Sequence, residues 1–151
     1  TLTKSDNPIN DKRIFMKSQI IFGLLAAIDG HAKNFSIFLM PGGIKLTPIY
    51  DVMSAHPPIA KKQIPFEKAK LAMAVGKNRH YKIREIAKRH WLQTARMAKF
   101  PAQEIENIIE NLKAQTDDVI SNVTQLLPKG FPKEVSKPIF DGVSKLSKIL
   151  K

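Results

Sequence analysis

Cysteine is absent from the sequence, which excludes disulfide bonds and any metal site built on thiolates. The chain therefore fits a reducing compartment, and we expect it in the cytoplasm. Long apolar runs are also missing, because the longest one, from Ile20 to Ile28, is far shorter than the roughly 20 residues of a membrane-spanning helix. We therefore expect no membrane among its partners, and the 151 residues suffice for one domain with a buried core.

Acidic residues are scarce as well, since 13 aspartates and glutamates stand against 25 lysines and arginines. The imbalance is concentrated in residues 68–99, which carry a charge of +9 with Glu85 as their single acid. We call these residues the basic block. A charge run of this kind is usually a solvated face, but its density also attracts phosphate backbones or an acidic protein surface. The candidates for contacts with nucleic acid are Lys77, Arg79, Lys82 and Arg84.

Hydrophobic spacing predicts a mainly α-helical protein. A first helix is expected from Asn10 or Asp11 to Ile28, with Asn10 as its N-cap. Its second half is apolar on nearly every side, which predicts that this helix is buried in the core. Residues 54–69 contain three prolines and are predicted to form a loop, and residues 70–75 are ambiguous between strand and helix.

The second half of the chain is predicted to be continuously helical. Helical spacing begins at Tyr81, and Pro101 marks the start of a new helix, where its missing N–H costs nothing. The run from Pro128 to Pro132 ends that helix, and a final helix is expected from Lys133 to near Lys151, disturbed by Pro138.

One polar stretch stands out because it directly follows the apolar run. Asp29 is followed five residues later by Asn34, the spacing of a kinase catalytic loop, where the Asp orients the attacking hydroxyl and the Asn holds Mg²⁺. Residues 35–50 then predict a β-hairpin that returns the chain to Asp51, so Asp51 is expected beside Asn34. Two oxygen ligands suit Mg²⁺, because phosphate and water complete its octahedral shell. Tyr50 is expected in the core.

The spacing of Asp29 and Asn34 alone does not establish a functional site. Asp117 and Asn122 show the same spacing inside an apparently ordinary amphipathic helix, without a following hairpin and Asp. Asp29 and Asn34 could also simply satisfy the backbone of a turn, as these residue types often do. It is the loop, hairpin and Asp51 together that favour a site.

These residues resemble the C-terminal part of the HipA-type toxin kinases. The resemblance rests on Asp-Gly-His-x-Lys-Asn-Phe-Ser at 29–36 and Leu-Thr-Pro-x-Tyr-Asp-Val at 46–52, and it extends through residues 70–76, 89–91, 99–101 and 127–128. It implies a mainly helical lobe of a protein-kinase-like fold with a small β-hairpin. It also implies a serine/threonine protein kinase of a toxin–antitoxin pair that uses ATP and Mg²⁺, with glutamyl-tRNA synthetase as the family's target.

The resemblance assigns expected roles to single residues. It implies that Asp29 is the catalytic Asp and that Asn34 and Asp51 are the metal ligands. His31 occupies a place near the expected γ-phosphate, so it either contacts phosphate or hydrogen-bonds the loop. Lys33 could neutralise phosphate charge, pair with Asp29 or remain solvated.

Two rival functions stay open at this point. A small-molecule phosphotransferase of the aminoglycoside- or choline-kinase type shares the spacing, although such enzymes usually carry a His where this chain has Ala27. The other rival is a non-catalytic module that binds antitoxin or DNA through the basic block. The family resemblance implies a HipB-like DNA-binding antitoxin and contacts with the operator backbone, for which residues 77–80 look like a flexible phosphate-contacting loop.

The expected domain organisation is a single C-terminal lobe over residues 1–151. Its catalytic loop and hairpin span 29–51, and its helical remainder spans 81–151. A kinase also needs a strand Lys and a cover for the phosphates, which lie in an N-terminal lobe that this chain is expected to lack. We therefore expect weak nucleotide binding and no meaningful turnover from the chain alone.

Overall fold

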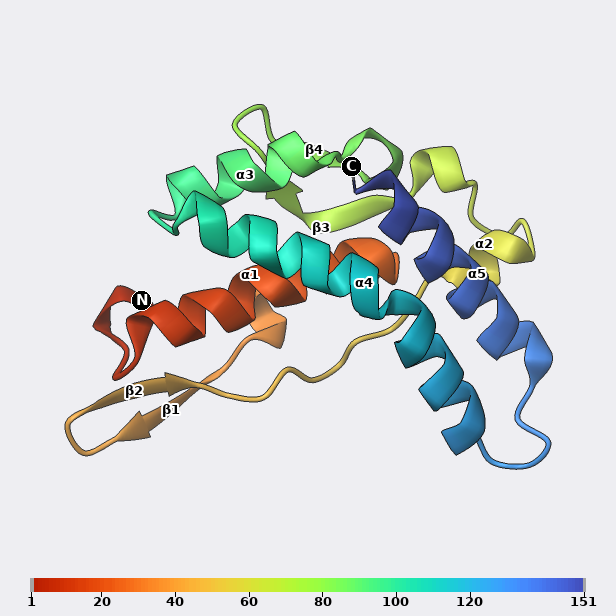
Figure 1. The fold of residues 1–151 in the computed structure, drawn as a ribbon, viewed down its shortest axis with the longest axis horizontal. Helices are drawn as coiled ribbons and strands as arrows, with labels where there is room; N and C mark the ends of the chain where they lie inside the picture. Colours follow the sequence, from red (N-terminus) through yellow and green to blue (C-terminus); the bar gives the residue numbers. More distant parts are fainter. Residues whose placement is uncertain (1, 151) are drawn as a thin grey trace.

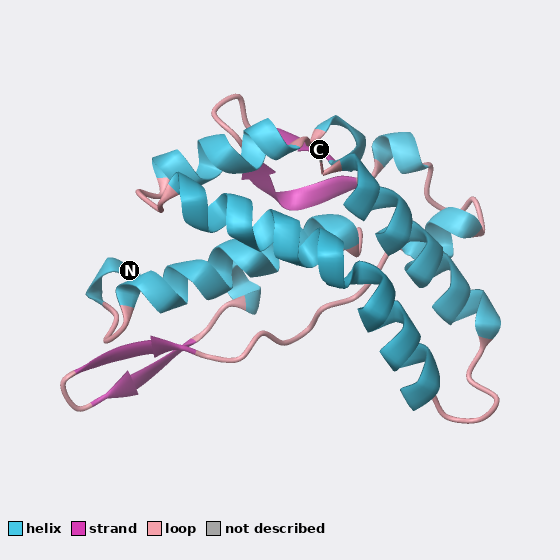
Figure 2. Ribbon diagram, in the orientation of Figure 1, coloured by secondary structure: helices cyan, strands magenta, loops and turns pink. Residues whose placement is uncertain are grey.

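The computed structural model describes residues 2–150, and in that range it is mainly helical with two separate antiparallel strand pairs (Figures 1 and 2). This confirms the expected fold class. Four short 3₁₀ turns lie at Leu2–Lys4, Ala32–Asn34, Phe66–Lys68 and Ile83–Glu85. The longer elements are α1 (Pro8–Leu24), β1 (Ile37–Met40), β2 (Gly43–Leu46), α2 (His56–Ala60), β3 (Lys70–Val75), β4 (His80–Lys82), α3 (Lys88–Met97), α4 (Ala102–Leu126) and α5 (Lys133–Ile149).

Helix α1 is the central element, and it packs against both α4 and α5 (Figure 1). Its apolar side chains Met16 and Ile20 are almost completely buried and form one core with Trp91, Ile105 and Ile109. Full burial of a large apolar side chain contributes about 1.5–3 kcal/mol. The helix predicted from the apolar run is therefore buried, as expected, and it holds the residues that follow it in place.

The start of α1 differs from the prediction. The N-cap is Asn7 rather than Asn10, because the Asn7 side chain accepts a hydrogen bond from the Asn10 amide at 3.2 Å. Pro8 then occupies the first turn, where a proline is compatible with a helix.

The end of α1 comes four residues earlier than predicted, at Leu24. Ala26 adopts a left-handed conformation with φ of 49°, and its amide bonds to the Gly23 carbonyl. The Ala27 amide bonds to the Phe22 carbonyl at 2.8 Å. This is the Schellman pattern of helix termination, with alanine at the position that usually holds glycine. The helix stop places Asp29 in a separate loop rather than next to the last helical turn.

Two predictions for the middle of the chain are wrong. Residues 54–69 contain the helix α2, because Pro57 and Pro58 lie in its first turn, where their missing N–H groups are not needed. The helix expected from Tyr81 begins only at Lys88, since residues 80–82 form a strand. Strand β4 pairs with β3 with Val75 opposite His80, which resolves residues 70–75 as a strand.

The two last helices lie where the sequence predicted them. Helix α4 begins directly after Pro101, and α5 continues through Pro138. Position 151, where the last helix was expected to end, lies outside the described residues. None of the helices within residues 2–150 combines the length and the apolarity that crossing a membrane would require.

Candidate functional site

The loop that carries Asp29 lies directly on helix α1. Gly30 is buried against the ring of Phe22, and a Cβ atom at this position would stand 2.5 Å from a carbon of that ring. Phe22 in turn packs against Phe35, with ring centroids 5.8 Å apart. Only glycine allows this close approach, so Gly30 and the two phenylalanines fix the distance between the loop and the helix.

The hairpin brings Asp51 to Asn34. Strands β1 and β2 pair with Ile37 opposite Leu46, so the chain returns to the point from which it left. The Asn34 side chain is buried, and its Nδ2 donates a hydrogen bond to Asp51 Oδ2 at 2.9 Å. Asp51 itself has φ of 55°, a left-handed conformation that aspartate tolerates better than most residues. The juxtaposition predicted from the hairpin is therefore present.

Tyr50 fastens the loop to the hairpin instead of filling the core. Its side chain is exposed, at 44%, so the expectation of a core residue is wrong. The hydroxyl group lies 2.7 Å from Ser36 Oγ and donates to the Lys33 carbonyl at 3.2 Å. In the sequence, Tyr50 directly precedes Asp51, and this position could have indicated a role beside the site. Its apolar ring alone suggests a core residue.

Asp29 and His31 form the exposed end of the site. The Asp29 side chain is 69% exposed, and its Oδ1 lies 3.8 Å from His31 Nε2, too far for a hydrogen bond. His31 Nδ1 is buried without a hydrogen-bond partner among the described residues. Lys33 is exposed and forms no ion pair with Asp29 in the described part of the chain. The Asp29 carboxylate is therefore exposed and free to accept a hydrogen bond from a hydroxyl group.

The residues after Asp51 are tied to the end of α1. Ser54 Oγ donates to the Leu25 carbonyl at 2.6 Å, and the Ala55 amide donates to the Ala26 carbonyl at 3.1 Å. His56 Nε2 lies 2.8 Å from the Leu24 carbonyl, which makes this nitrogen the protonated one of the neutral ring. Burial lowers the pKa of His56, and the hydrogen bond to Leu24 opposes this only in part. These bonds satisfy the carbonyl of Leu24 and those of the two residues that follow α1, and they fix both sides of the site to one helix end.

A buried carboxylate supports the hairpin from the other side. Asp11 on α1 is only 1% exposed, and it accepts hydrogen bonds from the Ser5 hydroxyl and from the Leu46 amide at 3.0 Å. The sequence reading treated Asp11 only as a helix-start signal. Its hydrogen bond to Leu46, 35 positions further along the chain, is a tertiary contact that local sequence patterns do not predict.

The Asn34 and Asp51 pair can be tested for its fit to a divalent cation. Two oxygens bound to Mg²⁺ at right angles and at about 2.1 Å lie about 3 Å apart, close to the observed 2.9 Å between the two side chains. At present the amide nitrogen faces Asp51, while Asn34 Oδ1 accepts the His31 amide at 3.2 Å. A 180° rotation of the amide would exchange oxygen and nitrogen at the cost of both hydrogen bonds, and a cation held between the two oxygens would take the place of the bond to Asp51.

The remaining ligands of a cation bound to Asn34 and Asp51 would have to come from groups outside this pair. No group of three or more His, Cys, Asp or Glu side chains suited to a metal occurs within residues 2–150. Mg²⁺ usually keeps several waters and binds one or two protein oxygens together with phosphates. The pair therefore fits a cation that arrives with a polyphosphate better than a free cation.

The basic block comprises strands β3 and β4 with the tight turn between them, and helix α3 with the 3₁₀ turn that precedes it. Residues 76–79 connect β3 to β4, and the amides of Gly76 and Lys77 bond to side chains of α3 at 2.7 Å and 3.0 Å. This turn is tethered, which contradicts the expected flexible loop. Lys77 and Arg79 are exposed.

The other two nominated cations differ in their surroundings. Lys82 is partly buried and pairs with Glu85 at 3.2 Å, whereas Arg84 is exposed and lies 3.9 Å from the same carboxylate. The structure therefore leaves Lys77 and Arg79 as the cations of this group without an acidic partner within residues 2–150.

The fold and the loop, hairpin and Asp unit together define the C-terminal region of a kinase-like fold. A sequence model described as "HipA-like C-terminal domain" matches residues 1–120, and the chain belongs to this family. A solved structure shares the fold: HipA of Shewanella oneidensis MR-1, from a toxin–antitoxin complex of HipA, HipB and operator DNA. The TM-score is 0.76 at 20% sequence identity, and the match covers 97% of this chain. It covers 33% of the HipA chain, so the present chain spans about a third of that protein's length.

Proposed function

We propose that this chain is the C-terminal lobe of a HipA-like serine/threonine protein kinase. In this proposal Asp29 accepts the proton of a protein hydroxyl group, or orients it, while Asn34 and Asp51 hold Mg²⁺ on the phosphates of ATP. A cation held by these two side chains would neutralise the charge of the phosphates. The observation that carries the proposal is the 2.9 Å contact between Asn34 and Asp51, beside a loop in which the Asp29 carboxylate is exposed and makes no hydrogen bond with the described residues.

The chain supplies only half of such a site. On strand β1 the side chains of Phe38 and Leu39 are 51% and 80% exposed, and Met53, two residues after Asp51, is 64% exposed, so large apolar side chains face solvent here. These side chains would be covered by the N-terminal lobe that brings the strand Lys. We therefore expect the chain alone to bind a nucleotide weakly and to transfer no phosphate at a useful rate.

A metal-binding measurement on the 151-residue chain tests the site without the second lobe. Titration of Mn²⁺ in the presence of a non-hydrolysable ATP analogue, followed by electron paramagnetic resonance, should show a protein-bound cation. Asp51→Asn should weaken its binding at least tenfold, because one of the two oxygen ligands loses its charge. The matched control is Asp117→Asn, which alters the second Asp and Asn pair with the same spacing but no Asp partner. Equal binding by all three proteins would refute the assignment of the ligands.

A small-molecule phosphotransferase remains an alternative that uses the same residues. It differs only in its acceptor, so it predicts transfer to an aminoglycoside or an amino alcohol instead of to a protein. Ala27 is 2% exposed, which leaves no room for the histidine that such enzymes usually carry at this position. We favour the protein kinase for this reason and for the family to which the chain belongs.

A second candidate function is binding to a HipB-like antitoxin and to the DNA backbone of an operator. The related Shewanella structure contains such components, and Lys77 and Arg79 form an exposed basic turn in this chain. Phosphate contacts of this kind position a protein without reading the base sequence. The contribution of the basic block would therefore be independent of the operator sequence.

Charge reversal separates this function from catalysis. Lys77→Glu with Arg79→Glu should weaken DNA binding equally for all sequences and lower the salt dependence by about one counterion per lost contact. Lys61→Glu with Lys62→Glu makes the same change in charge at exposed positions outside the basic block, and should have little effect. Equal losses in both double variants would show that only net charge matters.

A further inference from the structure

A groove lies between the helices α1, α4 and α5, and none of the residues Asp29, Asn34 and Asp51 lines it. Its volume is about 400 Å³, within the range of about 300–1,000 Å³ that is usual for small-molecule sites. Ten of the thirteen residues that line it are aliphatic or aromatic, among them Ile21 of α1 and Phe140 of α5. The groove is therefore large enough for an organic ligand and mainly apolar.

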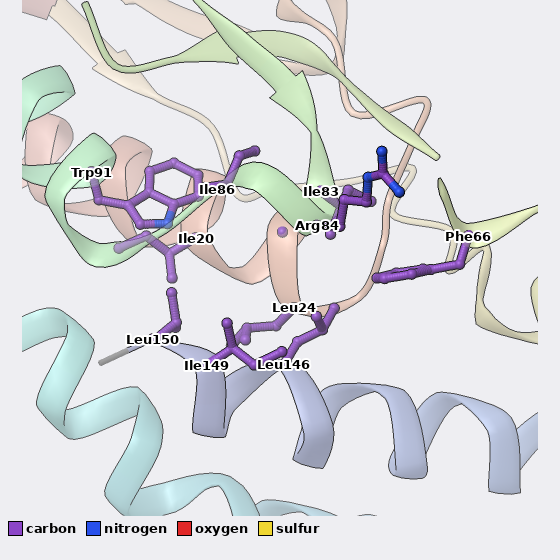
Figure 3. Close-up of a pocket in the computed structure, with 11 residues that line it drawn as sticks. Ile20, Leu24, Phe66, Ile83, Arg84, Ile86, Trp91, Leu146, Ile149 and Leu150 are labelled. Atoms are coloured by element: carbon purple, nitrogen blue, oxygen red, sulfur yellow. The ribbon is translucent and has the colours of Figure 1, made fainter. Parts of the chain in front are cut away.

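A second cavity in the core is too small for such a ligand. It lies where Ile20, Trp91 and Leu146 approach one another (Figure 3), and its volume is about 90 Å³. This is well below the volume of ordinary small-molecule sites. Of these two spaces, only the groove can hold a ligand of more than a few heavy atoms.

Part of the groove wall is exposed to solvent although it is apolar. Val119 and Val123 lie one turn apart on α4, and their side chains are 52% and 37% exposed. Covering such side chains with an apolar ligand removes them from water, which is favourable. The groove also borders the end of α1, where the carbonyls of Leu24 and Leu25 hold His56 and Ser54.

A single charged residue lines the groove within residues 2–150, and this residue is Lys17. Its side chain is exposed and forms no ion pair in the same range. Among the α1 residues of the wall, Lys17 is the first along the chain, one turn before Ile21, so it marks one end of the groove. A ligand that complements this wall is apolar along its length and carries one negative charge at its end.

The surrounding helices restrict the shape of the occupant. Helices α1, α4 and α5 contact one another in all three pairs, whereas a further helix with its side chains would be about 10–12 Å across. An extended peptide would also fit poorly, because the backbone groups of the surrounding helices are already hydrogen-bonded and cannot pair with its amides. An unbranched hydrocarbon chain meets neither obstacle.

We propose that this groove binds a free fatty acid, with the acyl chain between α4 and α5 and the carboxylate beside the Lys17 ammonium group. The inference rests on the apolar wall, the two exposed valines and the one unpaired cation. It goes beyond the proposed kinase function and is independent of it.

Isothermal titration of the 151-residue chain with decanoate, kept below the concentration at which it forms micelles, tests the proposal. Decanoate should bind saturably. Each methylene group that the groove covers should raise the affinity about fourfold, so decanoate should bind roughly fifteenfold more tightly than octanoate.

The role of the cation is tested with a neutral ligand of the same length. Lys17→Met should weaken decanoate binding about threefold, as expected for an exposed ion pair, and should leave decanol binding unchanged. Lys148→Met removes the same charge from an exposed position on α5 that does not line the groove, and should change neither affinity.

The position of the acyl chain is tested with a charge placed in the apolar wall. Val119→Asp should lower the decanoate affinity at least tenfold, and it should leave the protein folded because Val119 is half exposed. Ser121→Asp introduces the same charge at an exposed position on α4 outside the groove, and should have little effect.

Three results would overturn the proposal. The first is equal affinity for octanoate and decanoate, which would show that the groove does not cover the chain. The second is unchanged decanoate binding in Val119→Asp or in Lys17→Met, which would place the ligand elsewhere. The third is a dimer in sedimentation analysis that Val119→Asp dissociates and decanoate does not, which would assign the groove to a second copy of the chain.

Discussion

The buried carboxylate of Asp11 should be a main support of the hairpin that carries Asp51. It is 1% exposed and accepts hydrogen bonds from Ser5 and Leu46, which ties the N-terminal residues, α1 and β2 together. Hydrogen bonds to a charged group contribute about 1.5–3 kcal/mol each, and both donors are themselves buried. Asp11→Ala leaves both donors without a partner, so we expect a loss of about 3–5 kcal/mol in the free energy of unfolding.

The assay is equilibrium denaturation in urea, with thermal unfolding as a second readout. For a chain of this size 1 kcal/mol corresponds to about 2–4 °C, so the midpoint should fall by roughly 6–20 °C. Asp11→Asn keeps one acceptor and should lose about half as much. Asp118→Ala, an exposed aspartate on α4, is the control and should change stability by less than about 0.5 kcal/mol. An Asp11→Ala protein as stable as this control would refute the reasoning.

Two further predictions concern the same helix end. Gly30→Ala should displace the buried Phe22 ring and cost about 1–3 kcal/mol in urea denaturation, whereas an unchanged midpoint would mean that the loop can move aside. Burial lowers the pKa of His56 despite its bond to Leu24, so the unfolded chain binds the proton more readily and stability should decrease as pH falls below about 6.5. Burial lowers the pKa of His90 as well, with the nearby cationic groups as smaller causes, so His56→Gln should reduce this pH dependence without abolishing it; an identical pH profile in the variant would contradict the assignment.

Local sequence patterns predicted the parts of the site that short segments build. The hairpin from 35 to 50 has a two-residue turn between its strands and a clear pattern, so the approach of Asp51 to Asn34 followed from chain geometry. Helix α4 has a long apolar periodicity, which located it correctly, and the prolines at 128 and 132 placed the start of α5.

Contacts between segments that are far apart in the sequence could not be predicted from local sequence patterns. Residues 81–86 contain apolar positions compatible with a helix, but pairing of His80–Lys82 with β3 decides their conformation. The contact of Asp11 with Leu46 and the bonds of the Tyr50 hydroxyl likewise depend on tertiary packing. Helix α1 ends with Ala26 in the left-handed conformation. A glycine at this position would have allowed the helix end to be predicted from the sequence.

The most direct test of the central claim is phosphate transfer from labelled ATP to a protein substrate. Three proteins should be compared: this chain alone, the chain supplied with an N-terminal lobe, and that completed form with Asp29→Asn. We expect transfer only by the completed form with Asp29 intact, because in the proposed function Asp29 would position the hydroxyl group and both lobes would be needed to hold the cation and the nucleotide. Equal transfer by the Asp29→Asn form, or none by a completed form that binds ATP and is offered a broad set of protein substrates, would contradict the account.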